Sequence, residues 1–185
     1  MTKARTLASF DATGVLTSTS TLNPAKLDTA GTIPSELLAG VGGGKLLQLK
    51  QEIFTTQVNK AATSFTNLEH NGDTLAVTIT PTASDSKIYI NYTIQANHAS
   101  NRGYRSRIVQ NINGANTPVL EMSNQKDTYG DGDSHQGRSS VQYLDSPATT
   151  DAVTYTIQVA TDGANAVTFA EGNSPCMITV MEIAA

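Results

Sequence analysis

The sequence predicts an all-β protein, an antiparallel β-sandwich (jelly roll) head that follows an extended N-terminal arm. Only 15% of the residues are charged and 5% are aromatic, while Thr, Ser, Asn and Ala are abundant, a composition that suits strands with a polar face better than helices. From Lys45 onward, short segments alternate apolar and polar side chains with the two-residue period of a strand. Turn signals separate these segments.

Residues 1–44 form the predicted arm. The first 41 residues lack sustained alternation, and their scattered apolar side chains bury too little surface to order so long a segment alone. We therefore expect other chains, either copies of this one or a larger assembly, to order the arm. Residues 34–40 carry a weak helical signal, with Pro34 at the first position and Gly40 past the end. An irregular strand of a trimeric stalk fits these residues equally well.

Three glycines, Gly42, Gly43 and Gly44, end the arm. Together with Gly40 and Lys45 they resemble a phosphate-binding loop, but the glycine spacing is one residue short and a strand follows instead of a helix. Leu46 also occupies the position where Ser or Thr would bind magnesium. We therefore predict a hinge, because glycine permits unusual backbone angles between an arm and a head.

Residues 45–185 are long enough for one domain with its own core, and their strands can be placed in order. The clearest is at residues 88–97, where Ile88, Ile90 and Tyr92 begin an apolar face. Residues 176–181 are apolar on both faces, which predicts a central strand. The other expected strands are residues 46–58, 75–79, 104–112, 119–122, 139–144, 153–159 and 166–169. Turns are expected at Asn71-Gly72-Asp73, Asn113-Gly114, residues 130–132, Ser146-Pro147 and Asp162-Gly163. Eight or nine such strands predict a jelly roll.

Charge and cysteine content exclude several classes of function. A net charge of −4 and a pI near 5.2 give no basic surface for nucleic acid. We expect neither a signal peptide nor membrane insertion, because no apolar run is long enough for either. Cys176 is the single cysteine, so no intrachain disulfide forms, and we expect its side chain to be buried.

No motif predicts catalysis or a cofactor. A nucleophile elbow is absent, and His70, His98 and His135 are far apart in polar stretches, so we expect them on the surface or in loops. The weak candidates for a metal site are Asp127, Asp131 and Asp133, which lie in a glycine-containing polar stretch that could bind calcium. Their spacing does not match an EF-hand, so a solvated loop without metal is favoured.

One cluster stands above the background. Arg102, Tyr104, Arg105 and Arg107 gather three cations and an aromatic ring, and the strand period places Arg105 and Arg107 on one face. Such a cluster suits a subunit contact with acidic residues or the binding of an anionic glycan. We favour the subunit contact, because an acidic oligomer offers many carboxylates.

Several segments resemble fibre and structural proteins of marine tailed bacteriophages. In the N-terminal part these are KARTLA at residues 3–8, LDTAGTIP at 27–34 and GGGKLLQ at 42–48. In the head, residues 77–88, 144–150 and 155–158 resemble the knob domains of those proteins. The resemblance implies a virion appendage, usually trimeric, whose jelly-roll head is similar to those of the C1q and tumour-necrosis-factor group. It implies no catalytic residues.

The resemblance leads to an expected function. We expect a virion structural protein, made in the host cytoplasm, that forms a homotrimer on the particle exterior as a short fibre, a spike or a capsid decoration. The arm would anchor it to capsid, collar or tail proteins through Lys3, Arg5, Leu7 and Phe10. One alternative is a receptor-binding adhesin whose loops at 100–104 and 128–138 bind host-surface glycan. A carbohydrate-processing enzyme is less favoured, because no paired acidic site is visible.

Overall fold

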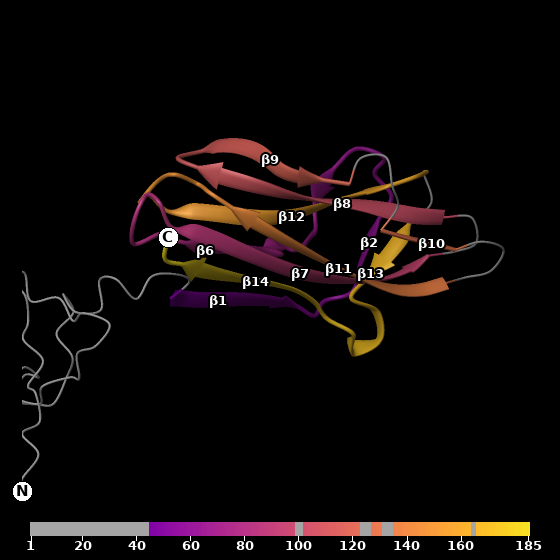
Figure 1. The fold of residues 1–185 in the computed structure, drawn as a ribbon. Helices are drawn as coiled ribbons and strands as arrows, with labels where there is room; N and C mark the ends of the chain where they lie inside the picture. Colours follow the sequence, from indigo (N-terminus) through magenta and orange to yellow (C-terminus); the bar gives the residue numbers. More distant parts are fainter. Residues whose placement is uncertain (1–44, 99–101, 123–126, 131–134, 164–165) are drawn as a thin grey trace, which may run out of the picture. The chain divides into compact units, whose positions relative to one another are not determined.

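A computed structural model describes residues 45–98, 102–122, 127–130, 135–163 and 166–185 (Figure 1). The expected arm, its glycine hinge, its anchoring residues and the weak helical signal at 34–40 lie outside the described residues. The described part is all-β, with fourteen strands and one short 3₁₀ turn, η2 (Glu171–Asn173). No helix among these residues is long and apolar enough to cross a membrane.

Two six-stranded antiparallel sheets make up most of the head. Sheet I contains β1 (Leu46–Phe54), β2 (Val58–Lys60), β7 (Lys87–His98), β11 (His135–Asp145), β13 (Val167–Phe169) and β14 (Cys176–Ile183). Sheet II contains β3 (Thr66–Asn67), β6 (Ala76–Ile79), β8 (Arg102–Ile112), β9 (Ala115–Glu121), β10 (Thr128–Gly130) and β12 (Val153–Thr161). A separate hairpin joins β4 (Glu69–His70) to β5 (Asp73–Thr74).

The strand pairing is nested. Among the eight strands of four or more residues, the first pairs with the last, the second with the seventh, the third with the sixth and the fourth with the fifth. These pairs are β1 with β14, β6 with β12, β7 with β11 and β8 with β9. This is the winding of a jelly roll, and it confirms the predicted fold class.

Local sequence signals account for two hairpin turns and for the place of one strand. Asn113 and Gly114 have φ values of 52° and 87°, and Asn71 and Gly72 have 51° and 93°. Positive φ at both central residues is the geometry that an Asn-Gly pair favours in a two-residue hairpin. The prediction that residues 176–181 form a central strand is also confirmed, because β14 lies between β1 and β7. The expected strand over 46–58 is instead two strands, β1 and β2.

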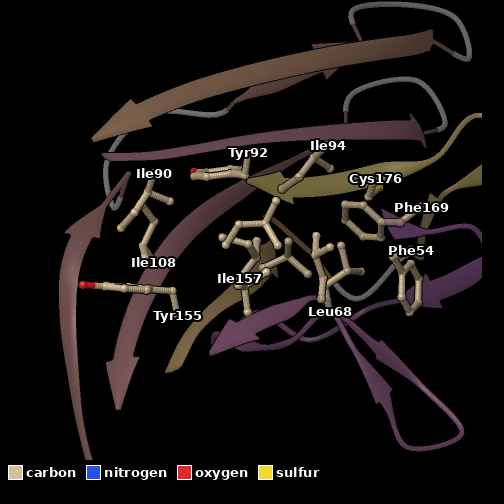
Figure 2. Close-up of a cluster of buried hydrophobic side chains, with 14 of the residues drawn as sticks. Phe54, Leu68, Ile90, Tyr92, Ile94, Ile108, Tyr155, Ile157, Phe169 and Cys176 are labelled. Atoms are coloured by element: carbon tan, nitrogen blue, oxygen red, sulfur yellow. The ribbon is translucent and has the colours of Figure 1, made fainter. Parts of the chain in front are cut away.

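The core lies between the two sheets. Ile90, Tyr92 and Ile94 of β7 face Ile108 of β8 and Ile157 of β12, and all five side chains are fully buried (Figure 2). Burial of aliphatic and aromatic side chains of this size is the main term that stabilises a sandwich. Cys176 is buried at one end of this cluster, as predicted.

Three buried tyrosines link the two sheets by hydrogen bonds across the core. Each hydroxyl meets a polar group of the opposite sheet: Tyr92 with Ser106 at 2.7 Å, Tyr104 with Ser139 at 2.6 Å, and Tyr155 with Asp145 at 2.6 Å. Burial raises the pKa of all three phenols, so they remain protonated. Because a buried hydroxyl without a partner is costly, these bonds favour one alignment of the sheets.

Side chains of β1 also donate hydrogen bonds to backbone carbonyls at the free edge of β6 and just after it. Lys50 Nζ donates to the Thr78 carbonyl at 2.9 Å, and Gln48 Nε2 donates to the Thr80 carbonyl at 2.7 Å. An edge strand presents unpaired backbone groups that can pair with other chains. Side chains from sheet I therefore occupy carbonyls at this edge of sheet II.

Glu182 of β14 is the buried acceptor at the same edge. Its Oε1 accepts hydrogen bonds from Thr82 N (2.6 Å), Thr82 Oγ1 (2.7 Å) and Ser86 Oγ (2.7 Å), and its Oε2 accepts one from Gln48 Nε2 (2.5 Å). Burial alone would raise the pKa of Glu182. The hydrogen bonds from Gln48, Ser86 and Thr82 outweigh that effect and lower the pKa to about 2. The carboxylate is therefore held as an anion by neutral donors.

We predict that Glu182 makes the stability of the head depend on acid pH. The folded pKa of about 2 lies below the ordinary value of 4.5, so its contribution is present above pH 4.5 and is lost as the pH falls towards 2. Glu182→Gln places an amide where donors converge and should lower the free energy of unfolding at pH 7 by about 1 to 3 kcal/mol. Denaturant unfolding between pH 2 and 7 measures both effects.

Glu52→Gln is the matched control, because Glu52 is an exposed carboxylate on β1. This variant should keep the stability and the acid dependence of the parent chain. An equal response of the Glu52 and Glu182 variants would contradict the role given to Glu182.

Candidate interaction surfaces

The predicted arginine cluster lies on the outer face of sheet II. Arg105 and Arg107 project from the same face of β8, as the strand period requires, and both cover Phe65. The guanidinium carbon of Arg107 lies 4.4 Å from the ring centroid, and that of Arg105 lies 5.5 Å away. Both distances are in the range of a cation–π contact. Arg102, at the start of β8, lies against Gly163.

Arg107 is also part of a polar ladder, defined by Glu121, Arg107, Gln158 and Asn67, which crosses β9, β8, β12 and β3. Arg107 Nη1 forms a salt bridge with Glu121 Oε2 at 2.9 Å, and its Nε donates to Gln158 Oε1 at 2.8 Å. Gln158 Nε2 then donates to Asn67 Oδ1 at 2.8 Å. The acidic partner of Arg107 is therefore within its own chain, and the expected subunit or glycan contact of this cluster stays a prediction.

Tyr104 does not lie on the surface where that contact was expected. Its side chain is fully buried, and its ring meets the edge of Phe169 with 5.1 Å between centroids. The reason is parity: Tyr104 lies between the outward-facing Arg105 and the buried Gly103, and its side chain points from β8 into the core. The same alternation that groups Arg105 with Arg107 thus separates Tyr104 from them.

Asp127, a weak candidate for calcium, instead ends a hydrogen-bonded chain from the core. Ser106 Oγ donates to Asp127 Oδ2, and the Tyr92 hydroxyl bonds to the same serine. Asp127 Oδ1 is buried and accepts no hydrogen bond from the described residues. Burial raises the pKa of Asp127 above its ordinary value of 3.8, although the bond from Ser106 opposes the shift.

The other two calcium candidates, Asp131 and Asp133, lie outside the described residues. Among the residues with described positions, no three His, Cys, Asp or Glu side chains gather as metal ligands do. The hydroxyl of Ser106 occupies one oxygen of Asp127, so that oxygen is already used within the chain.

The expectation that the histidines lie on the surface or in loops is wrong for His98, which is buried in a strand beside the exposed His135. His98 ends β7, His135 begins β11, and the two are direct cross-strand neighbours. Their rings stack with centroids 5.8 Å apart, and His98 is only 1% exposed. The sequence carries no local signal of this pair, because β11 begins four residues before the segment in which alternation is readable.

An apolar face, which sequence analysis did not predict as a surface, covers the outside of sheet I. We define it by residues whose side chains share this side in the strand register: Leu46, Leu49, Ile53, Tyr89, Leu144, Met177, Met181 and Ile183. Leu49, Met181, Tyr89 and Leu144 form one continuous row across β1, β14, β7 and β11. Leu49 is 53% exposed and Leu144 is 54% exposed at its two ends.

The next two rows of this face are less apolar. Gln51, Thr179, Asn91 and Gln142 form a polar row, in which Gln51 Nε2 donates to Thr179 Oγ1 at 2.9 Å. Beyond it, Ile53 and Met177 share a row with Thr93 and Ser140. None of these three rows contains a charged side chain. The outer faces of the two sheets therefore differ: sheet II carries an ionic polar ladder, and sheet I carries large apolar side chains.

Comparisons with known proteins find likeness to solved structures and no match in sequence. No family model and no curated protein matches the chain. Among solved structures, the chain is similar to a mutant VP2 protein of infectious bursal disease virus from derived T=1 particles, with a TM-score of 0.41 and 12% identity over 75% of this chain. A VP2 subviral particle of the same virus gives a TM-score of 0.40 and 10% identity over 76%. The chain spans 37% and 38% of the length of those proteins.

We predict that Asp127→Asn stabilises the head at neutral pH. A raised folded pKa means that ionisation of Asp127 opposes folding, and this penalty grows as the pH rises from 3.8 through the folded pKa. The neutral amide removes it, so the free energy of unfolding at pH 7 should rise by on the order of 1 kcal/mol.

Denaturant unfolding of both chains at pH 3 and pH 7 measures this change. The gain should disappear at pH 3, where the parent carboxyl is already protonated. A less stable Asn variant at pH 7 would show that the ionised carboxylate has a favourable partner instead, and a chelator that also destabilises the parent would identify that partner as a cation.

Proposed function

We propose that this chain is a non-enzymatic structural protein of a tailed-bacteriophage virion. In this proposal it is a homotrimer on the particle exterior, a short fibre, a spike or a capsid decoration, attached through its N-terminal arm. The jelly-roll head is the displayed part, and capsid, collar or tail proteins are the partners of the arm.

The observation that carries the proposal is the apolar face of sheet I. Large side chains such as Leu49, Ile53 and Leu144 are about half exposed on the outward side of a sheet whose other side is packed into the core. Contiguous exposed apolar surface of this kind is typical of proteins that assemble with others. Its three described rows carry apolar, hydroxyl and amide side chains, which suit packing and hydrogen bonding. The resemblance of residues 3–8, 27–34 and 42–48 to phage fibre and structural proteins gives the assembly its proposed setting.

The arm supplies attachment in this proposal. Lys3 and Arg5 offer two cations, and Leu7 and Phe10 offer apolar anchors, for contact with another virion protein. Gly42, Gly43 and Gly44 then allow the head to take an orientation different from that of the arm. A glycan contact of Arg105 and Arg107 stays a prediction outside this proposal; both guanidinium groups lie over Phe65, and that of Arg107 pairs with Glu121.

We predict that deletion of residues 1–44 abolishes incorporation into particles and leaves the head folded. The reason is that the nested strand pairs of the jelly roll, from β1 to β14, lie within residues 46–183. Incorporation is measured by quantitative blotting of purified particles from cells that express either form, and folding is measured by far-UV circular dichroism and thermal unfolding. The quadruple substitution of Lys3, Arg5, Leu7 and Phe10 by Ala tests the anchor itself.

A head that is incorporated equally well without residues 1–44 would overturn attachment through the arm. The control for expression is a chain with Ala substituted at Thr17, Ser18, Thr19 and Ser20, which changes the arm outside the proposed anchor. That chain should be incorporated as the parent is.

A further inference from the structure

We propose that the apolar face of sheet I is the surface through which the head binds a second copy of this chain. The inference deepens the proposed function, since it rests on the homotrimer proposed there and assigns its interface to named residues. The row of Leu49, Met181, Tyr89 and Leu144 would be the buried centre of that interface.

The burial pattern of β14 shows that no described part of the chain covers the apolar face of sheet I. Cys176, Ile178 and Val180 are fully buried against the core, while Met177, Met181 and Ile183 on the other side are only partly buried. A central strand that is apolar on both sides normally has a layer on each. Here the described chain provides one layer, and the second has to come from elsewhere.

Charge favours a copy of this chain as the cover. Each copy has a net charge of −4, so contact between two copies is opposed least at a face where no charged side chains approach each other. The three outward rows from β1 to β11 contain no charged side chain, whereas the outer face of sheet II presents Arg105, Arg107 and Glu121. Interfaces are depleted in charge at their centres and polar at their rims, which is the pattern of sheet I and not of sheet II.

The polar row also suits an identical partner. Gln51, Asn91 and Gln142 carry amides, and an amide both donates and accepts hydrogen bonds. The amides of a second copy of the chain can therefore form hydrogen bonds with these amides, and no pair of opposite charges is needed. Lys87, at the border of the face, donates to Ser146 at 2.9 Å and lies outside these rows.

The first test is the mass of the full chain in solution by analytical ultracentrifugation between about 0.1 and 100 μM. The parent chain should associate. Leu49→Lys with Met181→Lys puts two charges into the centre of the face and should weaken association roughly 100-fold or more. Leu144→Lys alone serves as a second variant if the double variant does not fold. Ala76→Lys is the matched control, because Ala76 projects from β6 on the outer face of sheet II. It should associate as the parent does.

A cysteine probe reports whether the face itself is covered. Cys176 is buried and is the single cysteine of the chain, so Leu49→Cys introduces one accessible thiol. Its reaction with a maleimide should slow at least tenfold as the protein concentration rises through the association range. Ala76→Cys should react at one rate throughout.

Three other outcomes overturn the inference. Variants on sheet I that associate like the parent would place the interface elsewhere. A thiol at position 49 that is protected equally at every concentration would identify residues 1–44 of the same chain as the cover. A monomeric parent with a reactive thiol would mean that no copy binds. If such a monomer is still incorporated into particles through its arm, virion attachment stands and only the interface fails. If the face is covered by a copy but the chain never enters particles, the proposed function fails and the interface stands.

Discussion

Side chains alternate across a β-strand, so a sandwich of two sheets can cover only one face of each strand. This constraint organises the whole head. The inward positions of β7, β8, β12 and β14 are filled by residues such as Ile90, Ile108, Ile157 and Ile178, which close the core. The outward positions are left to other interactions, and the two sheets use them differently. Sheet II joins outward side chains such as Arg107, Gln158 and Glu121 in polar contacts within the chain, whereas sheet I leaves large apolar side chains in contact with solvent.

Polar groups inside the sandwich set how the two sheets are aligned with each other. The bonds from Tyr92, Tyr104 and Tyr155 each join a strand of one sheet to a strand of the other. Apolar packing alone tolerates sliding of one sheet over the other, but a hydroxyl that has to meet one partner does not. Glu182 has a comparable role at the edge, since its donors come from β1 and from the segment after β6. These hydrogen bonds therefore fix the alignment of the two sheets at several separate points around the core.

Much of the fold could be predicted from the sequence because its signals are local. Alternation located most strands, Asn-Gly pairs located two turns, and apolar residues on both sides of 176–181 predicted a central strand. The contacts on the candidate interaction surfaces could not be predicted in this way. The stacking of His98 on His135 and of Arg107 on Phe65 depends on which segments become neighbours, and neither partner has a local pattern that reveals the other. The apolar face has the same origin: Leu49, Tyr89 and Leu144 form a row only after β14 is placed between β1 and β7 and β11 is placed beyond β7.

Because the first strand, β1, pairs with the last, β14, Lys45 and Ala184 lie at the same end of the head. The Ala184 amide donates to the Lys45 carbonyl at 3.0 Å, so the chain enters and leaves the head at one point. Lys87 and Ile183 are register partners at this end, while His98 and His135 are partners at the opposite end of β7. A peptide fused after Ala185 would emerge beside the point where the chain enters the head. One inserted between His98 and Arg102 would be displayed as far from that point as the length of β7 allows.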